Sequence, residues 1–359
     1  MRHGKEPSGY CSAFWFNSLG IIVWNGWKLT TNDLGYSKET RVSKYRKHLP
    51  QLQDELFMTD GGLETTLIFH DGVDLPSFAA FDLLKDRAGS DVLRRYFAQY
   101  AQLARRHDTG LVLESPTWRA NPDWAAKLGY DAANLADANR KAIGLLLDIR
   151  AAFESEQTKI VISGNLGPRG DGYTPDLRMS ARDAADYHAP QVETFAQTDA
   201  DMVAAFTMNY VEEAIGIATA AKNSAMPVAI SFTLEVDGNL PSGDSLAQAV
   251  TRTDRETNRY PAYYMINCAH PTHFEHVLRD GDEWRKRIRG LRANASRRSH
   301  AELDQSTELD TGDAEELGRQ YRALQKLLPR LSVVGGCCGT DHRHVDAMVR
   351  AMGARGGIQ

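Results

Sequence analysis

LSVVGGCCGT, residues 331–340, carries the strongest signal in the chain. Its two valines are β-branched and typical of a buried strand, and the two glycines after them allow a sharp turn and a close approach of the backbone. Cys337 and Cys338 follow directly. Adjacent cysteines strain the geometry of a disulfide with each other, so two thiols at the end of a strand indicate a site for a soft metal ion.

A third thiol stands at the end of another apolar segment. Residues 263–268 read YYMINC, and Cys268 lies 69 residues before Cys337. This gap is too long for a zinc-finger knuckle and suits two βα units of a barrel. Three thiolates without an evident fourth ligand are typical of a catalytic zinc ion that keeps one position open. The sequence leaves two alternatives: a structural site completed by His342 or His344, and three cysteines that are merely buried.

Four motifs together resemble the homocysteine S-methyltransferase family. They are NC at 267–268, GGCCGT at 335–340, TDGG at 59–62 and GNLGP at 164–168. The resemblance extends from about Ser43 to the C-terminus. It implies a zinc-dependent thiol methyltransferase built as a single-domain (β/α)8 TIM barrel over residues 43–359.

The pattern of apolar runs agrees with a parallel α/β barrel. From residue 56 onward, short apolar runs alternate with amphipathic stretches, and every family motif follows a run, where barrels of this kind place their active sites. A doubly wound sheet is the alternative, but no GxGxxG follows the first strand. The predicted strands are 56–58, 111–113, 160–162, 202–206, 228–232, 263–268, 288–292 and 331–334. The predicted helices are 91–106, 132–153, 180–198, 211–222, 245–257, 313–328 and 342–352. The polar stretch 295–313 is interpreted as a solvated loop.

The resemblance also implies roles for single residues. The zinc ligands and catalytic residues would be Cys268, Cys337 and Cys338. The substrate-binding residues would be Asp60, Gly61, Gly62, Asn267 and Asn294, and Glu114 is added to them for its own position rather than from the family pattern. Asp60 would pair with a substrate ammonium group, the two glycines would give access to the backbone, and Asn267 would orient the metal ligands.

One position departs from the family pattern. Family members commonly carry glutamate at the end of strand four, where it binds the homocysteine ammonium group, and this chain has Phe206. Glu114 stands at the end of strand two, where the family usually has a hydroxyl residue. Either Glu114 replaces the missing carboxylate, or the acceptor is not homocysteine. Arg119 and Arg169, on the loops after strands two and three, are candidates to bind a substrate carboxylate.

The function expected from these observations is methyl transfer to the thiol of homocysteine, which gives methionine. The resemblance implies S-methylmethionine, S-adenosylmethionine or betaine as donor, since relatives that use folate carry extra domains. Trp118, Tyr173 and Phe206 could face such a cationic donor. The alternatives are methyl transfer to another small thiol or selenol, and a non-catalytic barrel with structural zinc.

Composition bounds the setting and the partners. The chain has 359 residues, of which 42% are hydrophobic and 25% charged, and a net charge of −5. No basic stripe points to nucleic acid or an anionic membrane, and no apolar run is long enough to span a bilayer. The expected partners are therefore a small thiol acceptor and a methyl donor, and a homo-oligomer stays open.

The fourth cysteine, Cys11, has no partner left for a disulfide, which favours a cytoplasmic setting. Residues 1–42 do not match the family and are interpreted as a disordered or non-native extension.

Overall fold

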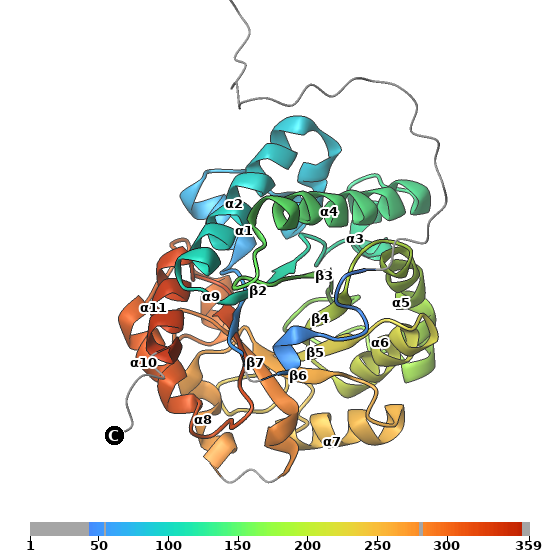
Figure 1. Cartoon of the computed structure of the whole chain (residues 1–359). Coiled ribbons are helices and arrows are strands. Elements are labelled where there is room, and N and C mark those ends of the chain that lie inside the picture. The colour runs from blue at the N-terminus through green and yellow to red at the C-terminus, as the bar shows by residue number, and fades with distance from the viewer. Residues whose placement is uncertain (1–42, 54, 280–282, 354–359) are drawn as a thin grey trace, which may run out of the picture. The chain divides into compact units, whose positions relative to one another are not determined.

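The computed structural model describes residues 43–53, 55–279 and 283–353. Eight parallel strands are hydrogen-bonded in chain order, and β8 pairs with β1, so the sheet closes into a barrel (Figure 1). The predicted (β/α)8 fold is thus confirmed. The strands are β1 Phe57–Met58, β2 Gly110–Glu114, β3 Ile160–Leu166, β4 Met202–Met208, β5 Val228–Thr233, β6 Tyr263–Asn267, β7 Ile288–Ala293 and β8 Val333–Gly336.

Helices follow the strands and cover the outside of the barrel (Figure 1). Their amphipathic faces bury apolar side chains against the sheet, as the helical spacing predicts. The helices are α1 Leu63–Thr65, α2 Arg87–Arg106, α3 Pro122–Lys127, α4 Ala132–Phe153, α5 Ala181–Ala196, α6 Val211–Asn223, α7 Leu246–Thr257, α8 Pro271–Arg279, α9 His300–Asp304, α10 Ala314–Leu324 and α11 His342–Gly353. Short 3-10 or π turns are η1 Pro50–Leu52, η2 Thr66–His70, η3 Pro76–Phe78, η4 Ala80–Lys85 and η5 Glu283–Arg287.

The inside of the barrel is a packed apolar core. Alternate residues of a strand point inward, so the interior is filled by one side chain in two along each strand. The buried interior residues include Phe57, Val112, Val161, Met202, Ala204, Ala229, Tyr263, Met265 and Val333. Above this core, the last inward positions of the strands become polar. The change from apolar to polar marks the end of the barrel at which a site can form.

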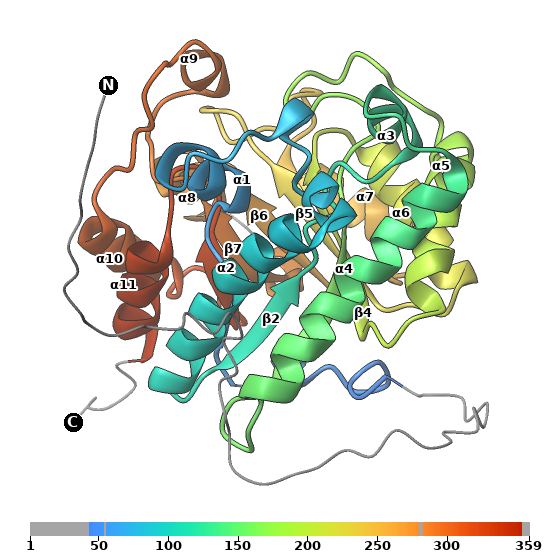
Figure 2. The same cartoon turned by 90° about the horizontal axis from the view of Figure 1, so that it is seen from above.

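The segment before β1 closes the opposite end. Arg46 donates hydrogen bonds to the carbonyl oxygens of Ala196, Thr198 and Ala200, which precede β4. Leu49 is buried against the interior core. In Figure 2 this segment lies at the lower edge and α9 at the upper edge. The predicted extension 1–42 lies outside the described residues, so its interpretation stays a prediction.

The interpretation of residues 295–313 as a solvated loop is wrong. The segment contains α9, and several of its side chains line the cavity at the carboxyl ends of the strands. Its many charged residues misled the sequence analysis, because some of them, such as Asp304 and Asp310, line the cavity although their kind is typical of a solvated loop.

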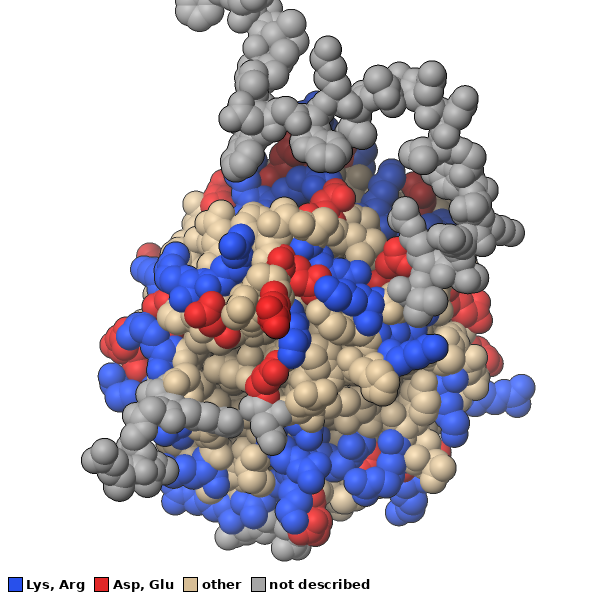
Figure 3. Space-filling model, viewed as in Figure 1, with Lys and Arg blue, Asp and Glu red and all other residues tan. Residues whose placement is uncertain are grey.

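The described surface carries charges of both signs. Figure 3 shows basic and acidic side chains interspersed on the face that it presents. None of the helices within the described ranges is both long enough and apolar enough to cross a membrane.

Candidate active site

The end of β7 brings together cysteines that are distant in sequence. β7 lies between β6, which leads into Cys268, and β8, which leads into Cys337 and Cys338. The N–H of Cys268 donates to the carbonyl oxygen of Arg292 at 3.1 Å, and that of Cys337 donates to Ala293 at 2.9 Å. The N–H of Ala295, which follows β7, donates to the carbonyl oxygen of Cys338 at 3.0 Å. Backbone hydrogen bonds from one strand end therefore hold both cysteine segments.

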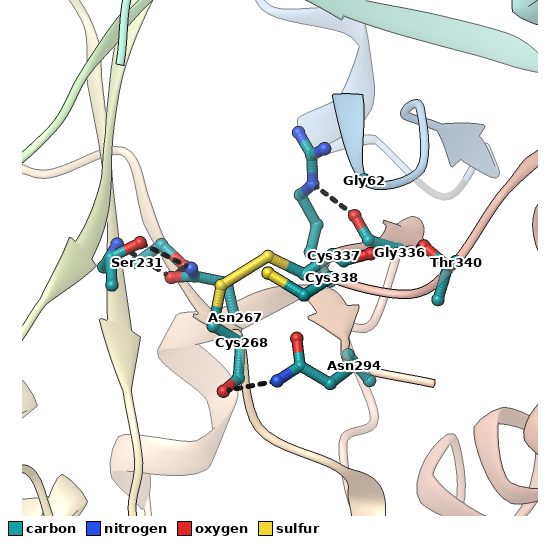
Figure 4. Close-up of a disulfide and its surroundings, with 12 residues drawn as sticks. Gly62, Ser231, Asn267, Cys268, Asn294, Gly336, Cys337, Cys338 and Thr340 are labelled. Carbon is teal, nitrogen blue, oxygen red and sulfur yellow. Dashed lines mark hydrogen bonds between the residues drawn. A yellow bond between two sulfur atoms is a disulfide. The ribbon is translucent and has the colours of Figure 1, made fainter. Parts of the chain in front are cut away.

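The three sulfur atoms form one cluster, with all three within 4.8 Å of one another. The structure joins Cys268 and Cys337 by a disulfide and leaves Cys338 free beside it (Figure 4). Free thiols were expected at all three positions. Burial raises the pKa of the Cys338 thiol to about 11, and a neighbouring cation would favour its thiolate.

The cluster fits a zinc ion once Cys268 and Cys337 are thiols. Zn–S bonds of about 2.3 Å in tetrahedral geometry place sulfur atoms about 3.8 Å apart, within the spacing found here. No histidine or carboxylate of the described residues joins the three sulfurs. His344, considered above as a fourth ligand, instead donates from Nε2 to the carbonyl oxygen of Thr311 at 2.7 Å. The described side chains thus provide three ligands and leave one coordination position open.

The two glycine-rich turns pack backbone to backbone. The Gly62 N–H donates to the carbonyl oxygen of Thr340 at 3.0 Å, and the Gly336 N–H donates to that of Asp60 at 2.9 Å. A Cβ atom on Gly62 would come within 2.6 Å of the Cys337 carbonyl oxygen. Glycine is required at this position because the turn after β1 packs too closely against the cysteine turn after β8 to leave room for a side chain. Gly61 and Gly62 also line the cavity, as expected of substrate-binding residues.

Asp60 already has a protein partner. Its Oδ1 lies 2.7 Å from Nη2 of Arg292, and Tyr96 donates to its Oδ2 at 3.1 Å. Arg292 also donates to the carbonyl oxygens of Gly61 and Gly336, both at 3.0 Å. Burial raises the pKa of the Asp60 carboxyl, while Arg292 opposes that shift. The charge of Asp60 is therefore largely balanced before any substrate arrives.

Glu114 is in the opposite situation. Its side chain is 3% exposed, and neither carboxylate oxygen has a hydrogen-bond partner among the described residues. Burial raises the pKa of Glu114 to about 7, and the positive charge of Arg292 opposes that shift. Glu114 lines the same cavity as the cysteines. A buried carboxylate with open acceptor positions is suited to a cationic or hydrogen-bond-donating ligand.

The two predicted asparagines serve different strand ends. Asn267 accepts from the Ser231 hydroxyl at 2.6 Å and from the Thr207 N–H at 3.0 Å, so it ties together the ends of β4, β5 and β6. None of these hydrogen bonds of Asn267 involves a cysteine sulfur atom. Asn294 donates to the carbonyl oxygen of Cys268 at 3.1 Å (Figure 4). Its Oδ1 is buried without a partner, so Asn294 has an acceptor free at the cavity.

All of the predicted site residues line one cavity of about 430 Å³ at the carboxyl ends of the strands. Trp118, Tyr173 and Phe206 line it too. The Trp118 and Phe206 rings each already face a guanidinium group, that of Arg119 at 4.0 Å and that of Arg292 at 5.0 Å. One face of each of these two rings is therefore covered by an arginine side chain and is not free to face a cationic methyl donor.

The two loop arginines differ. Arg119 lines the cavity and lies between two tryptophan rings, where burial lowers its pKa to about 10. Arg169 pairs with Asp123 at 2.8 Å and is not among the cavity residues, so it is not placed to bind a carboxylate in that cavity.

Sequence reasoning missed two residues of the site. Arg292 occupies a β7 position that reads as an ordinary charged residue, and His300 lies in the segment taken for a loop. Arg292 is the last residue of the predicted strand 288–292, the position at which other strands carry their site residues, and that position was the available signal.

The fold and the cavity define a barrel enzyme with a thiol cluster where the strands end. A family model described as homocysteine S-methyltransferase matches residues 57–352. The chain therefore belongs to the homocysteine S-methyltransferase family and is a methyltransferase.

Relatives of known name agree with this assignment. Homocysteine S-methyltransferase YbgG of Bacillus subtilis is 25% identical over 243 residues, which cover 60% of this chain and 73% of the relative. The homocysteine methyltransferase MmuM of Escherichia coli is similar in structure. Its oxidised form gives a TM-score of 0.67 at 20% identity, covering 86% of this chain and 98% of that one. Its metallated form gives 0.66 at 19% identity, covering 83% and 96%. At these identities the structural matches show the fold.

Proposed function

We propose that the protein transfers a methyl group from a sulfonium or ammonium donor to the thiol of homocysteine and thereby forms methionine, with zinc bound by Cys268, Cys337 and Cys338. The observation that carries this proposal is the cluster of three sulfur atoms in the cavity that Glu114 also lines. When bound, zinc would stabilise the acceptor thiolate, which is the nucleophilic form of a thiol.

The reaction balances without redox chemistry. The acceptor thiol releases its proton, and its sulfur forms a bond to the donor methyl carbon. The bond from that carbon to the donor's sulfonium sulfur or ammonium nitrogen breaks, and its electron pair stays on the donor atom. The donor leaves as a neutral thioether or tertiary amine. The enclosing cavity orients both substrates and keeps water from the methyl group.

Glu114 is the proposed partner of the acceptor's ammonium group. Asp60 is engaged by Arg292, and Phe206 supplies no charge at the end of β4. Glu114 retains two free acceptor oxygens inside the cavity. An unpaired ammonium group in such a site would cost several kcal/mol, at least about 3, so the substrate should lie against this carboxylate.

The alternative within enzymes is methyl transfer to another small thiol or selenol. Phe206 favours this alternative, because its ring stacks on Arg292 and presents an apolar surface where relatives carry a carboxylate. The open coordination position argues against a purely structural zinc site. Three thiolate ligands also require a reducing compartment, which supports the cytoplasmic location proposed from cysteine usage.

A matrix of donors and acceptors tests the proposal. Reduced, zinc-loaded protein would be assayed with S-methylmethionine, S-adenosylmethionine and betaine against homocysteine, cysteine and selenocysteine. We expect turnover with homocysteine and one of the cationic donors. Turnover only with a different acceptor would select the alternative, and no turnover with any pair would contradict both.

Metal analysis of cysteine variants tests the ligand set. We expect about one zinc ion per chain in the unmodified protein, and loss of most of it in Cys268→Ala and in Cys337→Ala. Full retention of zinc in both variants would contradict the assignment.

A further inference from the structure

His300, the first residue of α9, contacts Cys268 and also Tyr173, which lies beside Cys338. Its Nε2 donates a hydrogen bond to the carbonyl oxygen of Cys268 at 2.6 Å. Its ring stacks on Tyr173, with centroids 4.1 Å apart, and the Tyr173 hydroxyl lies 3.9 Å from Sγ of Cys338. On the other side, Nδ1 of His300 lies 3.1 Å from Oε1 of Glu235. Loops after β3, β5 and β7 thus meet at one buried imidazole ring.

Cys268 needs such support because its backbone is left-handed. Its φ is +52°, a conformation that residues with a Cβ atom seldom adopt and that persists only where the surroundings hold it. Its carbonyl oxygen accepts two hydrogen bonds, from His300 and from Asn294. Asn294 directly follows β7, whose end forms the backbone hydrogen bonds to the two cysteine segments. His300 comes from the covering segment, so that segment helps to fix the direction of the Cys268 side chain.

We propose that His300 is a positioning residue whose hydrogen bond to the carbonyl oxygen of Cys268 holds that cysteine in the geometry that binds the metal ion. It touches neither the substrate nor the reacting atoms in this role. The inference rests on the proposed zinc site, and the segment 295–313 is thereby part of the metal centre. Residues that orient metal ligands in this way commonly affect metal affinity by about 10–100-fold.

Two substitutions of His300 distinguish the effect of its hydrogen bond to Cys268 from the effect of its ring stacking on Tyr173. His300→Phe keeps a flat ring against Tyr173 and removes the donor to Cys268. His300→Gln loses the stacking and retains an amide N–H near the position of Nε2. His273→Phe is the matched control, because His273 donates to the Arg297 carbonyl oxygen of the same segment at 2.8 Å and contacts no cysteine.

Zinc affinity, measured by competition with a chelator, is the first readout. We expect the dissociation constant to rise at least 10-fold in His300→Phe and to stay within about threefold of the unmodified protein in His300→Gln and His273→Phe. Equal affinity in His300→Phe and the unmodified protein would overturn the proposal, and so would an equal loss in His273→Phe. Should His300→Phe fail to fold, a 10-fold loss in folded His300→Gln would also overturn it.

A readout without metal keeps this inference distinct from the proposed function. In zinc-free protein equilibrated with reduced and oxidised glutathione, positioning of Cys268 favours its disulfide with Cys337 by raising the effective concentration of the two thiols. We expect the equilibrium constant for this disulfide to fall at least 10-fold in His300→Phe. An unchanged constant contradicts the role of His300. Failure of the unmodified protein to bind zinc contradicts the proposed function instead.

Discussion

Glu114 makes opposite contributions to the free protein and to the proposed complex. Burial raises the pKa of its carboxyl from 4.5 to about 7. Between these values the unfolded chain has lost the proton that the folded chain retains, so folding stability falls as the pH rises through this range. At one pKa unit per 1.36 kcal/mol, the loss reaches about 3 kcal/mol above pH 7.

Glu114→Gln should therefore stabilise the free protein at alkaline pH. We expect its free energy of unfolding to exceed that of the unmodified protein by up to about 3 kcal/mol at pH 8, with the difference vanishing near pH 4.5. Urea denaturation at pH 5 and pH 8 measures it. Glu193→Gln, at an exposed position of α5, is the control and should show no such dependence. A variant less stable than the unmodified protein at pH 8 would show that Glu114 is paired in the free protein.

The same substitution should impair acceptor binding. Glutamine cannot compensate the charge of an ammonium group, and truncating one partner of a buried charge pair usually costs about 2–5 kcal/mol. We expect Glu114→Gln to weaken homocysteine binding by that amount at pH 8 while zinc content stays unchanged, as measured by calorimetry and metal analysis. Unchanged homocysteine turnover in Glu114→Gln would rule out the proposed pairing.

At the scale of elements, the turns after β1 and β8 depend on each other. A methyl group at Gly62 would press on the Cys337 carbonyl oxygen, which belongs to the backbone and cannot rotate away. We expect Gly62→Ala to destabilise the fold by about 1–3 kcal/mol, as overpacking does, and to weaken zinc binding. Thermal denaturation and metal analysis measure both effects.

Gly144→Ala is the matched control for Gly62→Ala. Gly144 lies inside α4, and a Cβ atom there meets nothing within 4 Å. Alanine favours a helix over glycine by about 0.5–1 kcal/mol, so this variant should gain stability. If Gly144→Ala lost as much zinc as Gly62→Ala, the conclusion that the turn after β1 supports the zinc-binding cysteines would be contradicted.

The strands, the long helices except α8, and the cysteine cluster could be predicted from sequence, whereas α8 and the short helices α1, α3 and α9 were missed. The apolar periodicity located all eight strands to within a few residues, and the ends of β6 and β8 located the three cysteines. The charge pairing could not be predicted. Asp60 was expected to be free for a substrate, and its partner Arg292 comes from a strand that is distant in sequence. Position alone could not show that Glu114 lacks a partner.

At the scale of the molecule, residues 43–52 close the end of the barrel remote from the site. Arg46 donates hydrogen bonds to the carbonyl oxygens of Thr198 and Ala200 there, and Leu49 packs against the interior core. A chain that begins at Ser43 should melt like the full chain. A chain that begins at Gln53 should lose at least about 3 kcal/mol, from one buried leucine and the charged hydrogen bonds. Differential scanning calorimetry compares them. A marked drop for the Ser43 chain would show that residues 1–42 pack on the barrel.

The backbone hydrogen bonds at the end of β7 affect how the substrate specificity of such an enzyme can evolve. The spacing of the thiols is set by main-chain hydrogen bonds from residues 292, 293 and 295, which are independent of side-chain identity. Other residues that line the cavity stand on other strands, among them the charged Glu114 on β2 and the apolar Phe206 on β4. Substitutions of the side chains that line the cavity can therefore change which acceptor binds. The backbone that sets the spacing of the three sulfur atoms is unaffected by such substitutions.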